Sequence, residues 1–338
     1  MRSMRCNAKI RLTAVFILFF ISSCTDNRQE SPYEDILTRE PFSLLTDSIK
    51  NKPKDDGLYF RRAVLLNSNN LPEPALVDFQ KAWSLNKDER YALAIGNLLL
   101  EKKPDSAILF LNNAIKELSH SFLLDLTLAR AYAAQNQIAE ALTICNIILQ
   151  KNPQQVDVLK LKADLLDKKG NSAEATVLLE NAYHITPFDV ELNYVLALRY
   201  AEAKDPRVLS ICDSLIKADT EGKHAEPYYY KGIYYSNTGD STKALNFFSD
   251  AIRHDYNFLD AYIEMGGQLY EMKKYADALA TFNLALTISP QFADAYYWIA
   301  KSQEAMGQKP EAKANYQRAY SLDQTMIEAK QAADRIIN

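Results

Sequence analysis

A repeat of 34 residues constrains the fold of this chain more than any other feature of its sequence. Alanine recurs with this spacing at Ala244, Ala278 and Ala312, and again seven residues further on in each unit. A small residue recurs in the same phase, and so does a bulky aromatic residue four positions before it. Because four columns keep one spacing, we expect eight near-identical structural units. They begin near Asp56, Arg90, Phe122, Val156, Val190, Ala225, Leu259 and Ala293.

Each unit has the pattern of two short amphipathic helices joined by a turn. Apolar residues recur at spacings of three and four, and Gly170, Gly239 and Gly307 stand mid-unit, where glycine can end a helix in the left-handed conformation. Alanines seven apart lie on one stripe of a helix and let neighbouring helices approach closely. A single helix pair cannot bury its apolar face alone, so successive pairs must stack. The sequence predicts an all-α fold, an α-α superhelix of about eight helix-turn-helix repeats.

The columns resemble those of the tetratricopeptide repeat (TPR) family. The seventh unit carries the signature most fully, whereas the sixth has Lys231 at a usually apolar position and the fifth has Val208 and Leu209 where alanine is expected. The resemblance covers about residues 56–324 and implies a TPR solenoid. The signature residues of the seventh unit are Tyr262, Met265, Gly266, Leu269, Ala278, Phe282, Ala285 and Pro290.

Two flanking segments are expected to close the array of repeats at 56–324. Residues 325–338 read as a lone C-terminal capping helix, because apolar side chains recur on one side and charged ones on the other. Residues 36–55 are expected to form an N-terminal half-repeat or cap. The polar residues 24–35 before it would serve as a tether.

The first 23 residues have the build of a secretory signal. Four basic residues precede the short apolar run 12–21, which is too short to span a bilayer. The ending Ile21-Ser22-Ser23-Cys24 resembles a bacterial lipobox, which implies cleavage before Cys24 and attachment of a lipid to its sulfur. Because Thr25 rather than aspartate follows, the resemblance favours the outer membrane over the inner. The expected location is therefore the bacterial cell envelope, facing the periplasm or the cell surface.

Motifs for catalysis, metals or nucleic acids are not found in the sequence. It has no phosphate-binding glycine loop, no zinc-binding helix motif and no paired C-x-x-C. The sequence has 39 basic and 43 acidic residues, and no block of basic residues of the kind that binds nucleic acid. The isolated histidines favour no metal site, and Cys145 and Cys212 lie in apolar helical patterns as expected core thiols. We expect neither an enzyme nor a cofactor.

The TPR resemblance selects the candidate binding residues. In this family the first helix of each unit lines the concave face, with positions 2, 5, 6, 9, 12 and 13 exposed there. In the C-terminal half of this chain these positions carry aromatic residues interleaved with acids, and aromatics are favoured binding anchors. Several of them could instead simply pack across the interior. The candidates are Tyr194, Tyr229, Tyr230, Glu264, Tyr270, Tyr297, Trp298, Lys301 and Glu304.

The function implied is that of a lipid-anchored scaffold or assembly adaptor, which binds a peptide or protein segment of another envelope protein in its concave face. A groove with acids suits a basic or proline-rich segment. The same aromatic face could instead hold an envelope glycan or other polymer. The second position of five consecutive units is acidic, which suits either a cationic partner or the dipole at the start of each helix. These acids are Asp157, Glu191, Glu226, Asp260 and Asp294.

Overall fold

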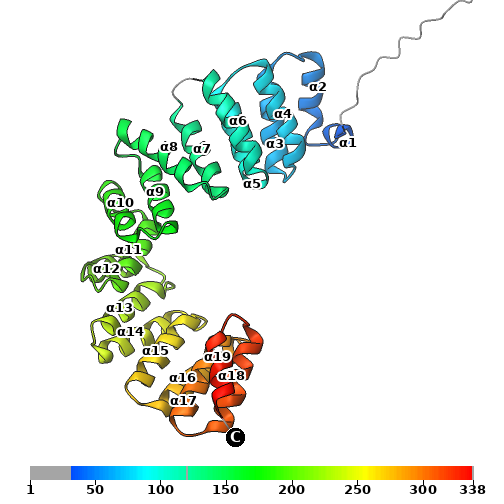
Figure 1. Cartoon of the computed structure of the whole chain (residues 1–338). Helices are drawn as coiled ribbons and strands as arrows, with labels where there is room; N and C mark the ends of the chain where they lie inside the picture. Colours follow the sequence, from blue (N-terminus) through cyan, green and yellow to red (C-terminus); the bar gives the residue numbers. More distant parts are fainter. Residues whose placement is uncertain (1–31, 119–120, 337–338) are drawn as a thin grey trace, which may run out of the picture. The chain divides into compact units, whose positions relative to one another are not determined.

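The computed structural model describes residues 32–118 and 121–336, and in them every regular element is a helix (Figure 1). The described residues form two compact units that divide between Lys87 and Asp88. The predicted signal, Cys24 and most of the predicted tether lie outside the described residues. The prediction of an all-α fold of eight helix pairs with a final capping helix is confirmed.

The N-terminal unit holds four helices. The short α1 (Glu34–Leu37) and α2 (Ser43–Asn51) precede the first repeat, which consists of α3 (Asp56–Ser68) and α4 (Pro72–Leu85). The side chain of Asp55 caps α3 by accepting a hydrogen bond from the backbone nitrogen of Leu58. Helix α1 begins two residues before the predicted cap, and α2 packs on α3.

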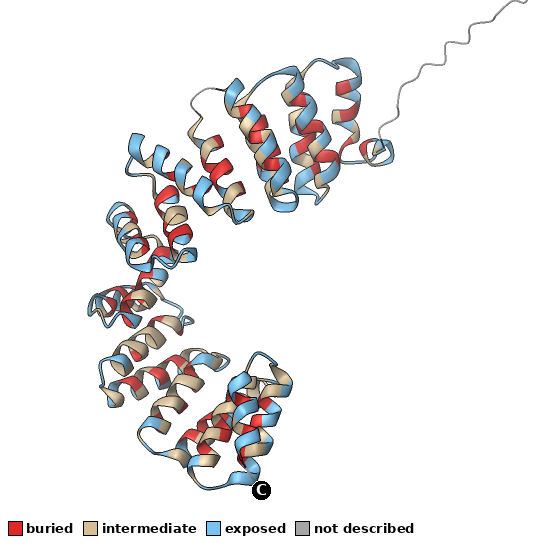
Figure 2. Cartoon of the chain, viewed as in Figure 1, coloured by how far each residue is buried: buried red, intermediate tan, exposed pale blue. Residues whose placement is uncertain are grey.

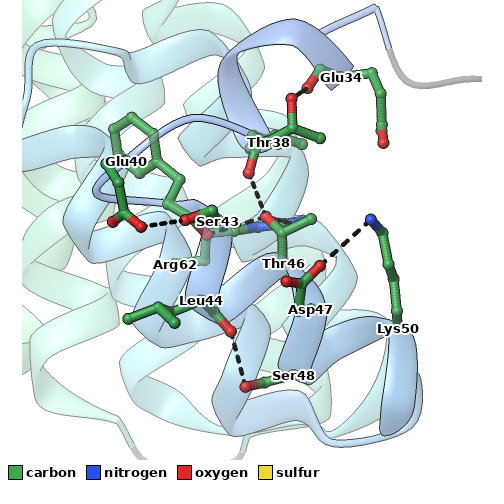
Figure 3. Close-up of polar contacts among 12 residues, drawn as sticks. Glu34, Thr38, Glu40, Ser43, Leu44, Thr46, Asp47, Ser48, Lys50 and Arg62 are labelled. Atoms are coloured by element: carbon green, nitrogen blue, oxygen red, sulfur yellow. Dashed lines mark hydrogen bonds and ion pairs between the residues drawn. The ribbon is translucent and has the colours of Figure 1, made fainter.

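A buried ion pair fastens these helices together. Arg62 on α3 donates two hydrogen bonds, of 2.6 and 2.8 Å, to the carboxylate of Asp78 on α4, and the two side chains are 7% and 5% exposed. Its third nitrogen donates to the hydroxyl of Thr46 on α2 at 2.9 Å (Figure 3). Thr46 in turn donates to the carbonyl oxygen of Leu37 at the end of α1 at 2.6 Å. One chain of hydrogen bonds therefore links α1, α2, α3 and α4.

The second unit contains seven helix pairs and the last helix, and each pair packs on the next (Figure 1). None of the helices that the structure describes combines the length and hydropathy that a membrane crossing requires. The pairs are α5 (Glu89–Lys102) with α6 (Pro104–Glu117), α7 (Phe122–Ala134) with α8 (Ile138–Lys151), α9 (Val156–Lys168) with α10 (Ser172–Ile185), α11 (Val190–Glu202) with α12 (Arg207–Ala218), α13 (Glu226–Asn237) with α14 (Ser241–His254), α15 (Leu259–Glu271) with α16 (Tyr275–Ile288), and α17 (Ala293–Ala305) with α18 (Lys309–Leu322), followed by α19 (Ile327–Arg335).

In seven of the eight repeats that the structure describes, the turn between the two helices contains a residue in the left-handed region, whereas Lys103 joins α5 to α6 in the second repeat with a φ of -144°. Gly170, Gly239 and Gly307 have φ values of 81°, 86° and 79° there. Lys204 and Lys273 take the same turn with φ values of 58° and 61°, although a side chain is disfavoured in that region. The repeated backbone geometry therefore holds even where the sequence lacks glycine.

Each helix pair has buried residues (Figure 2), and the alanine columns belong to them. Ala244, Ala278 and Ala312 are fully buried, and so are the alanines seven residues after them. In the fifth repeat Val208 and Cys212 are fully buried in α12, so larger side chains fill the space at that point. In the sixth, Lys231 places its ammonium 4.8 Å from the centre of the Phe247 ring and 2.6 Å from the Asp213 carboxylate. In both irregular units the departing side chains are therefore accommodated, by burial in the fifth and by contacts with neighbouring side chains in the sixth.

Candidate functional site

The structure divides the nine candidate residues into three groups. Tyr194 and Tyr230 line one cavity, of about 710 Å³, which we call the α11 cavity. Tyr270, Tyr297, Lys301 and Glu304 line a second, of about 630 Å³, which we call the C-terminal pocket. Trp298 borders this pocket through contacts with Tyr270 and Tyr297, whereas Tyr229 and Glu264 line neither cavity.

The C-terminal pocket is built from four helices of the last two repeats and the cap. Tyr270 comes from α15 and Tyr297, Lys301 and Glu304 from α17, while α18 and α19 supply the other lining residues. Residues 297, 301 and 304 follow one another at spacings of four and three, so they share one face of α17. The aromatic rings are held by packing: Trp298 stacks on the buried Phe282 with ring centres 5.8 Å apart.

Lys301 lies among three aromatic rings. Its ammonium nitrogen is 4.1 Å from the centre of the Trp298 ring, 5.2 Å from that of Tyr270 and 5.7 Å from that of Tyr297. These distances are those of cation–π contacts. The rings therefore hold the positive charge at the wall of the pocket.

Glu304 is held by the second helix of the repeat and by the cap. Its carboxylate accepts a hydrogen bond from the Tyr316 hydroxyl at 2.9 Å and one from Arg335 at 2.7 Å. Burial, followed by this contact with Glu304, raises the pKa of Tyr316, so its hydroxyl stays protonated and donates. The Tyr297 hydroxyl donates to Glu328 at 3.4 Å.

Sequence reasoning missed Tyr316 and the contribution of α19, because the last helix was assigned only a capping role. Helix α19 begins 34 residues after α17, so it takes the place of the first helix of a ninth repeat. Extending the 34-residue spacing to a ninth unit would have identified the side chains of α19 that line the pocket. They stand at the second, fifth, sixth and ninth positions, as Glu328, Gln331, Ala332 and Arg335.

The α11 cavity has a similar mixture of aromatic and polar walls. The rings of Tyr194 and Tyr230 meet edge to face, with centres 6.4 Å apart. Arg199 forms an ion pair with Asp167 and donates to the hydroxyl of Thr176 at 3.3 Å. Burial, with a smaller contribution from the nearby Glu226, raises the pKa of Tyr194 and Tyr230 to about 12. Both hydroxyls are therefore protonated at neutral pH and able to donate hydrogen bonds.

Tyr229 and Glu264 have different surroundings. Tyr229 packs against Phe258 and Phe248 with ring centres 5.1 and 5.9 Å apart, so at least part of its role is structural. Glu264 is half-buried, and burial followed by the charge of Asp260 raises the pKa of its carboxyl group. Among the described residues no donor lies within hydrogen-bond distance of the Glu264 carboxylate.

Within the described residues, no three histidine, cysteine, aspartate or glutamate side chains are grouped to hold a metal ion. Cys145 and Cys212 are buried free thiols, and burial raises their pKa values to about 11 and about 12. Thiols with raised pKa values are poor nucleophiles.

Comparison with known protein families decides the identity of the repeats. Models of the tetratricopeptide repeat match residues 98–165 and 294–323, and a model described as a TPR repeat matches residues 266–307. The chain is a tetratricopeptide repeat protein. Members of this family are typically non-catalytic scaffolds for protein–protein interaction. No curated protein matches this TPR chain at a significant level.

Solved structures share the TPR fold at low sequence identity. A TPR repeat-containing protein from Cytophaga hutchinsonii has a TM-score of 0.53 and 15% identity, over 71% of this chain and 98% of that one. PilW, a widely conserved type IV pilus biogenesis factor, has a TM-score of 0.51 and 16% identity, over 62% and 96%. The APC/C hetero-tetramer Cut9–Hcn1 has a TM-score of 0.50 and 17% identity over 90% of this chain, which spans 60% of that structure's chain.

Proposed function

We propose that this TPR protein is a lipid-anchored scaffold of the bacterial cell envelope. It would bind an extended segment of another envelope protein along the first helices of its last three repeats, α13, α15 and α17. The observation that carries this proposal is the C-terminal pocket, where α15 and α17 together present two tyrosine rings, a lysine and a glutamate to one cavity. Type IV pilus biogenesis, in which PilW is a factor, is one assembly process that such recruitment would serve.

The surface of α15 supports the binding of an extended chain. Gly267 lies one helical turn from both Glu264 and Tyr270, and a Cβ atom placed on it would meet no atom within 4 Å. The missing side chain therefore leaves open space between these two candidates. Among the described residues, neither Asp260 nor Glu264 forms an ion pair, so this stretch is suited to a basic residue of the partner.

Filling the open space at Gly267 should block the partner. We expect Gly267→Leu to abolish crosslinking from a photoreactive residue at Tyr270 to an envelope protein in intact cells. The helix itself should tolerate the change, because leucine is favoured over glycine in helices by about 0.8 kcal/mol. The measurement is the yield of crosslinked product, together with the thermal unfolding of the purified variant.

The matched control for this experiment is Ala314→Leu, which adds a similar side chain at an exposed position of α18. It should leave crosslinking from position 270 unchanged, and a photoreactive residue at the exposed Gln317 should give no product. Undiminished crosslinking in a folded Gly267→Leu variant would contradict binding along α15.

The envelope location rests on Cys24, which lies outside the described residues. We expect the Cys24→Ser variant to lose incorporation of labelled fatty acid, because Cys24 would carry the lipid. The protein should also move from the membrane fraction to the soluble one, because stable anchoring needs several acyl chains. Cys6→Ser is the matched control, since Cys6 belongs to the segment that cleavage would remove. A Cys24→Ser protein that stays in the membrane fraction would rule out the lipid anchor.

Glycan or polymer binding is the second candidate, and the partly buried rings of Tyr270 and Tyr297, which line the C-terminal pocket, favour it. Salt separates the two classes of ligand. Binding of a charged polypeptide should weaken as salt screens the charges, whereas stacking of a neutral sugar on aromatic rings should hardly respond. A pull-down from envelope extracts over a range of salt concentrations therefore decides between them.

A further inference from the structure

The third repeat lacks an aromatic ring that other repeats carry at the fourth position of their first helix. Tyr59, Tyr262 and Tyr296 stand at this position in the first, seventh and eighth repeats. Each hydroxyl donates, at 3.2 Å, to the carbonyl oxygen of the residue six positions earlier. The third repeat has Asp125 at this position instead. Because an aspartate side chain is much smaller than a tyrosine, it cannot fill the same space.

A cavity of about 390 Å³ lies at the corresponding place in the third repeat, and we call it the α7 pocket. Phe122 at the start of α7 and Ile148 on α8 form part of its wall. Leu259 and Ala285 stand at the same two positions of the seventh repeat, where they pack with Tyr262 in one apolar cluster. The α7 pocket is therefore the place of a missing aromatic side chain. Asp125, Ile147 and Lys151 also line it.

An aromatic ring of the right kind is exposed at the junction between the fourth and fifth repeats. Phe188 is 92% exposed, more than any other large hydrophobic side chain that the structure describes, and the nearby Ile185 and Val190 are 38% and 56% exposed. Gln154 and Gln291 stand at the position of Phe188 in the third and seventh repeats, so the junction does not itself require an apolar residue. A cluster of exposed apolar side chains around one ring marks a contact surface.

The segment that carries Phe188 has an excess of negative charge. The carboxylates of Asp189 and Glu191 both pair with the single ammonium of Lys160, at 3.3 and 2.7 Å. Two negative charges therefore share one positive charge.

The α7 pocket offers a positive charge to such a segment. Lys151 lines the pocket, and within the part of the chain that the structure describes its ammonium forms no ion pair. Asp125, the other charged residue that lines the pocket, already interacts with a residue other than Lys151. A ring followed by acids is thus matched to an apolar pocket with a lysine at its wall.

We propose that the α7 pocket binds Phe188 of a second copy of this chain. The pocket is lined in part by Asn152 and Gln155 at the junction after the third repeat, and Phe188 lies at the next junction. Because pocket and ring lie at neighbouring junctions, two copies related by a two-fold axis can each insert a ring into the other's pocket. This interface goes beyond the proposed function, because none of the candidate residues of the concave face belongs to it.

Crosslinking between two differently tagged copies tests the interface with full chains in cells. A photoreactive residue replaces Asn152, which is exposed and lines the pocket. We expect a crosslinked product that carries both tags, and mass spectrometry should place the second point of attachment within residues 185–191. A product formed only with a different protein, and with no second tag, would overturn the proposal.

Two replacements borrow residues that other repeats have at the same positions. Phe188→Gln should lower the yield of the two-tag product by roughly tenfold or more, because the aromatic anchor is lost. Asp125→Tyr places a ring in the pocket and should lower the yield to the same extent. Ile147→Glu, which adds a charge to the pocket wall, replaces it if thermal unfolding shows that Asp125→Tyr does not fold. The matched control is Tyr256→Gln, which removes a 55% exposed ring at another junction and should leave the yield unchanged.

Combining the two variants makes the test directional. If the photoreactive copy carries Phe188→Gln and the other copy carries Asp125→Tyr, one intact ring still meets one intact pocket, and the two-tag product should reappear. In the reverse arrangement the photoreactive copy has the filled pocket and its partner has no ring, so the product should stay absent. Equal yields in the two arrangements, or an undiminished yield with Phe188→Gln in both copies, would contradict the proposal. Gly267→Leu leaves ring and pocket intact and should not change the yield, so this test is independent of partner binding along α15.

Discussion

Asp78→Ala should destabilise the N-terminal unit by about 3 to 5 kcal/mol, the usual cost of removing one partner of a buried ion pair. The replacement leaves the guanidinium of Arg62 buried, with Thr46 as its remaining partner. Each of the four helices from α1 to α4 contributes one member of this network, so its loss should loosen the whole unit. Hydrogen exchange of the full chain, followed by mass spectrometry, should show faster exchange across residues 34–85.

Two variants separate the buried charge from general loss of packing. The double replacement Arg62→Met with Asp78→Leu removes both charges and should recover most of the lost stability, because apolar residues of similar volume often replace buried ion pairs without cost. The exposed pair of Lys168 with Asp164 provides the surface comparison, and Lys168→Met should change stability by no more than about 0.5 kcal/mol. An Asp78→Ala protein with unchanged exchange in α1 to α4 would show that the ion pair adds little.

The repeat made most of the fold predictable from the sequence. Ala278 and Ala285 stand in columns that recur every 34 residues, and a column that must stay small in each unit reports helix contact directly. The turns at Gly170, Gly239 and Gly307 were predictable for a similar reason. The same turn at Lys204 and Lys273 could not be predicted from the residue type, because lysine has no preference for the left-handed conformation.

The network of Arg62 and Asp78 lay beyond sequence reasoning. Its members occupy a single unit and its flanking helices, so no recurrence marks them, and charged residues are usually exposed. The pairing of Arg62 with Asp78 depends on how α3 packs on α4, and the bond to Thr46 on how α2 packs on α3, neither of which a pattern of residue types specifies. The sequence predicted a half-repeat before the first unit, and the structure adds the hydrogen bonds that attach it.

The residues of the candidate site could be predicted from the sequence, but the pairing of its charged side chains could not. The family register selected Tyr270, Tyr297, Lys301 and Glu304, and the structure gathers them at one cavity. The sequence could not show that the Glu304 carboxylate turns to Tyr316 and Arg335, because side-chain direction depends on partners from α18 and α19. The pairing of Glu304 with Arg335 leaves Lys301 and Glu328 as the pocket-lining charges without an ion pair among the described residues.

Two adjacent glycines on α15 should respond in opposite directions to the same replacement. We expect Gly266→Ala to destabilise the protein by about 1 to 3 kcal/mol, the usual cost of inserting atoms into a packed core. A Cβ atom at Gly266 would lie 2.3, 2.5 and 2.8 Å from atoms of the Phe282 ring. Phe282 is fully buried and stacked on Trp298, so the ring cannot withdraw without disturbing its neighbour. Gly267→Ala should instead stabilise the helix by up to about 1 kcal/mol, because its Cβ would enter open space.

Thermal unfolding and hydrogen exchange in α15 and α16 measure both effects in the full chain. Because Phe282 stacks on Trp298, Gly266→Ala should also shift Trp298 emission in a Trp83→Phe background, where Trp298 is the only tryptophan, whereas Gly267→Ala should not. Gly232→Ala repeats the test one unit earlier, where a Cβ would lie 2.5 Å from the Phe248 ring, and it should resemble Gly266→Ala. If both replacements on α15 were stabilising, the close approach of α15 and α16 would not explain the glycine at position 266. The opposite signs that we expect follow from which face of α15 each glycine occupies, one toward Phe282 in the core and one toward the groove.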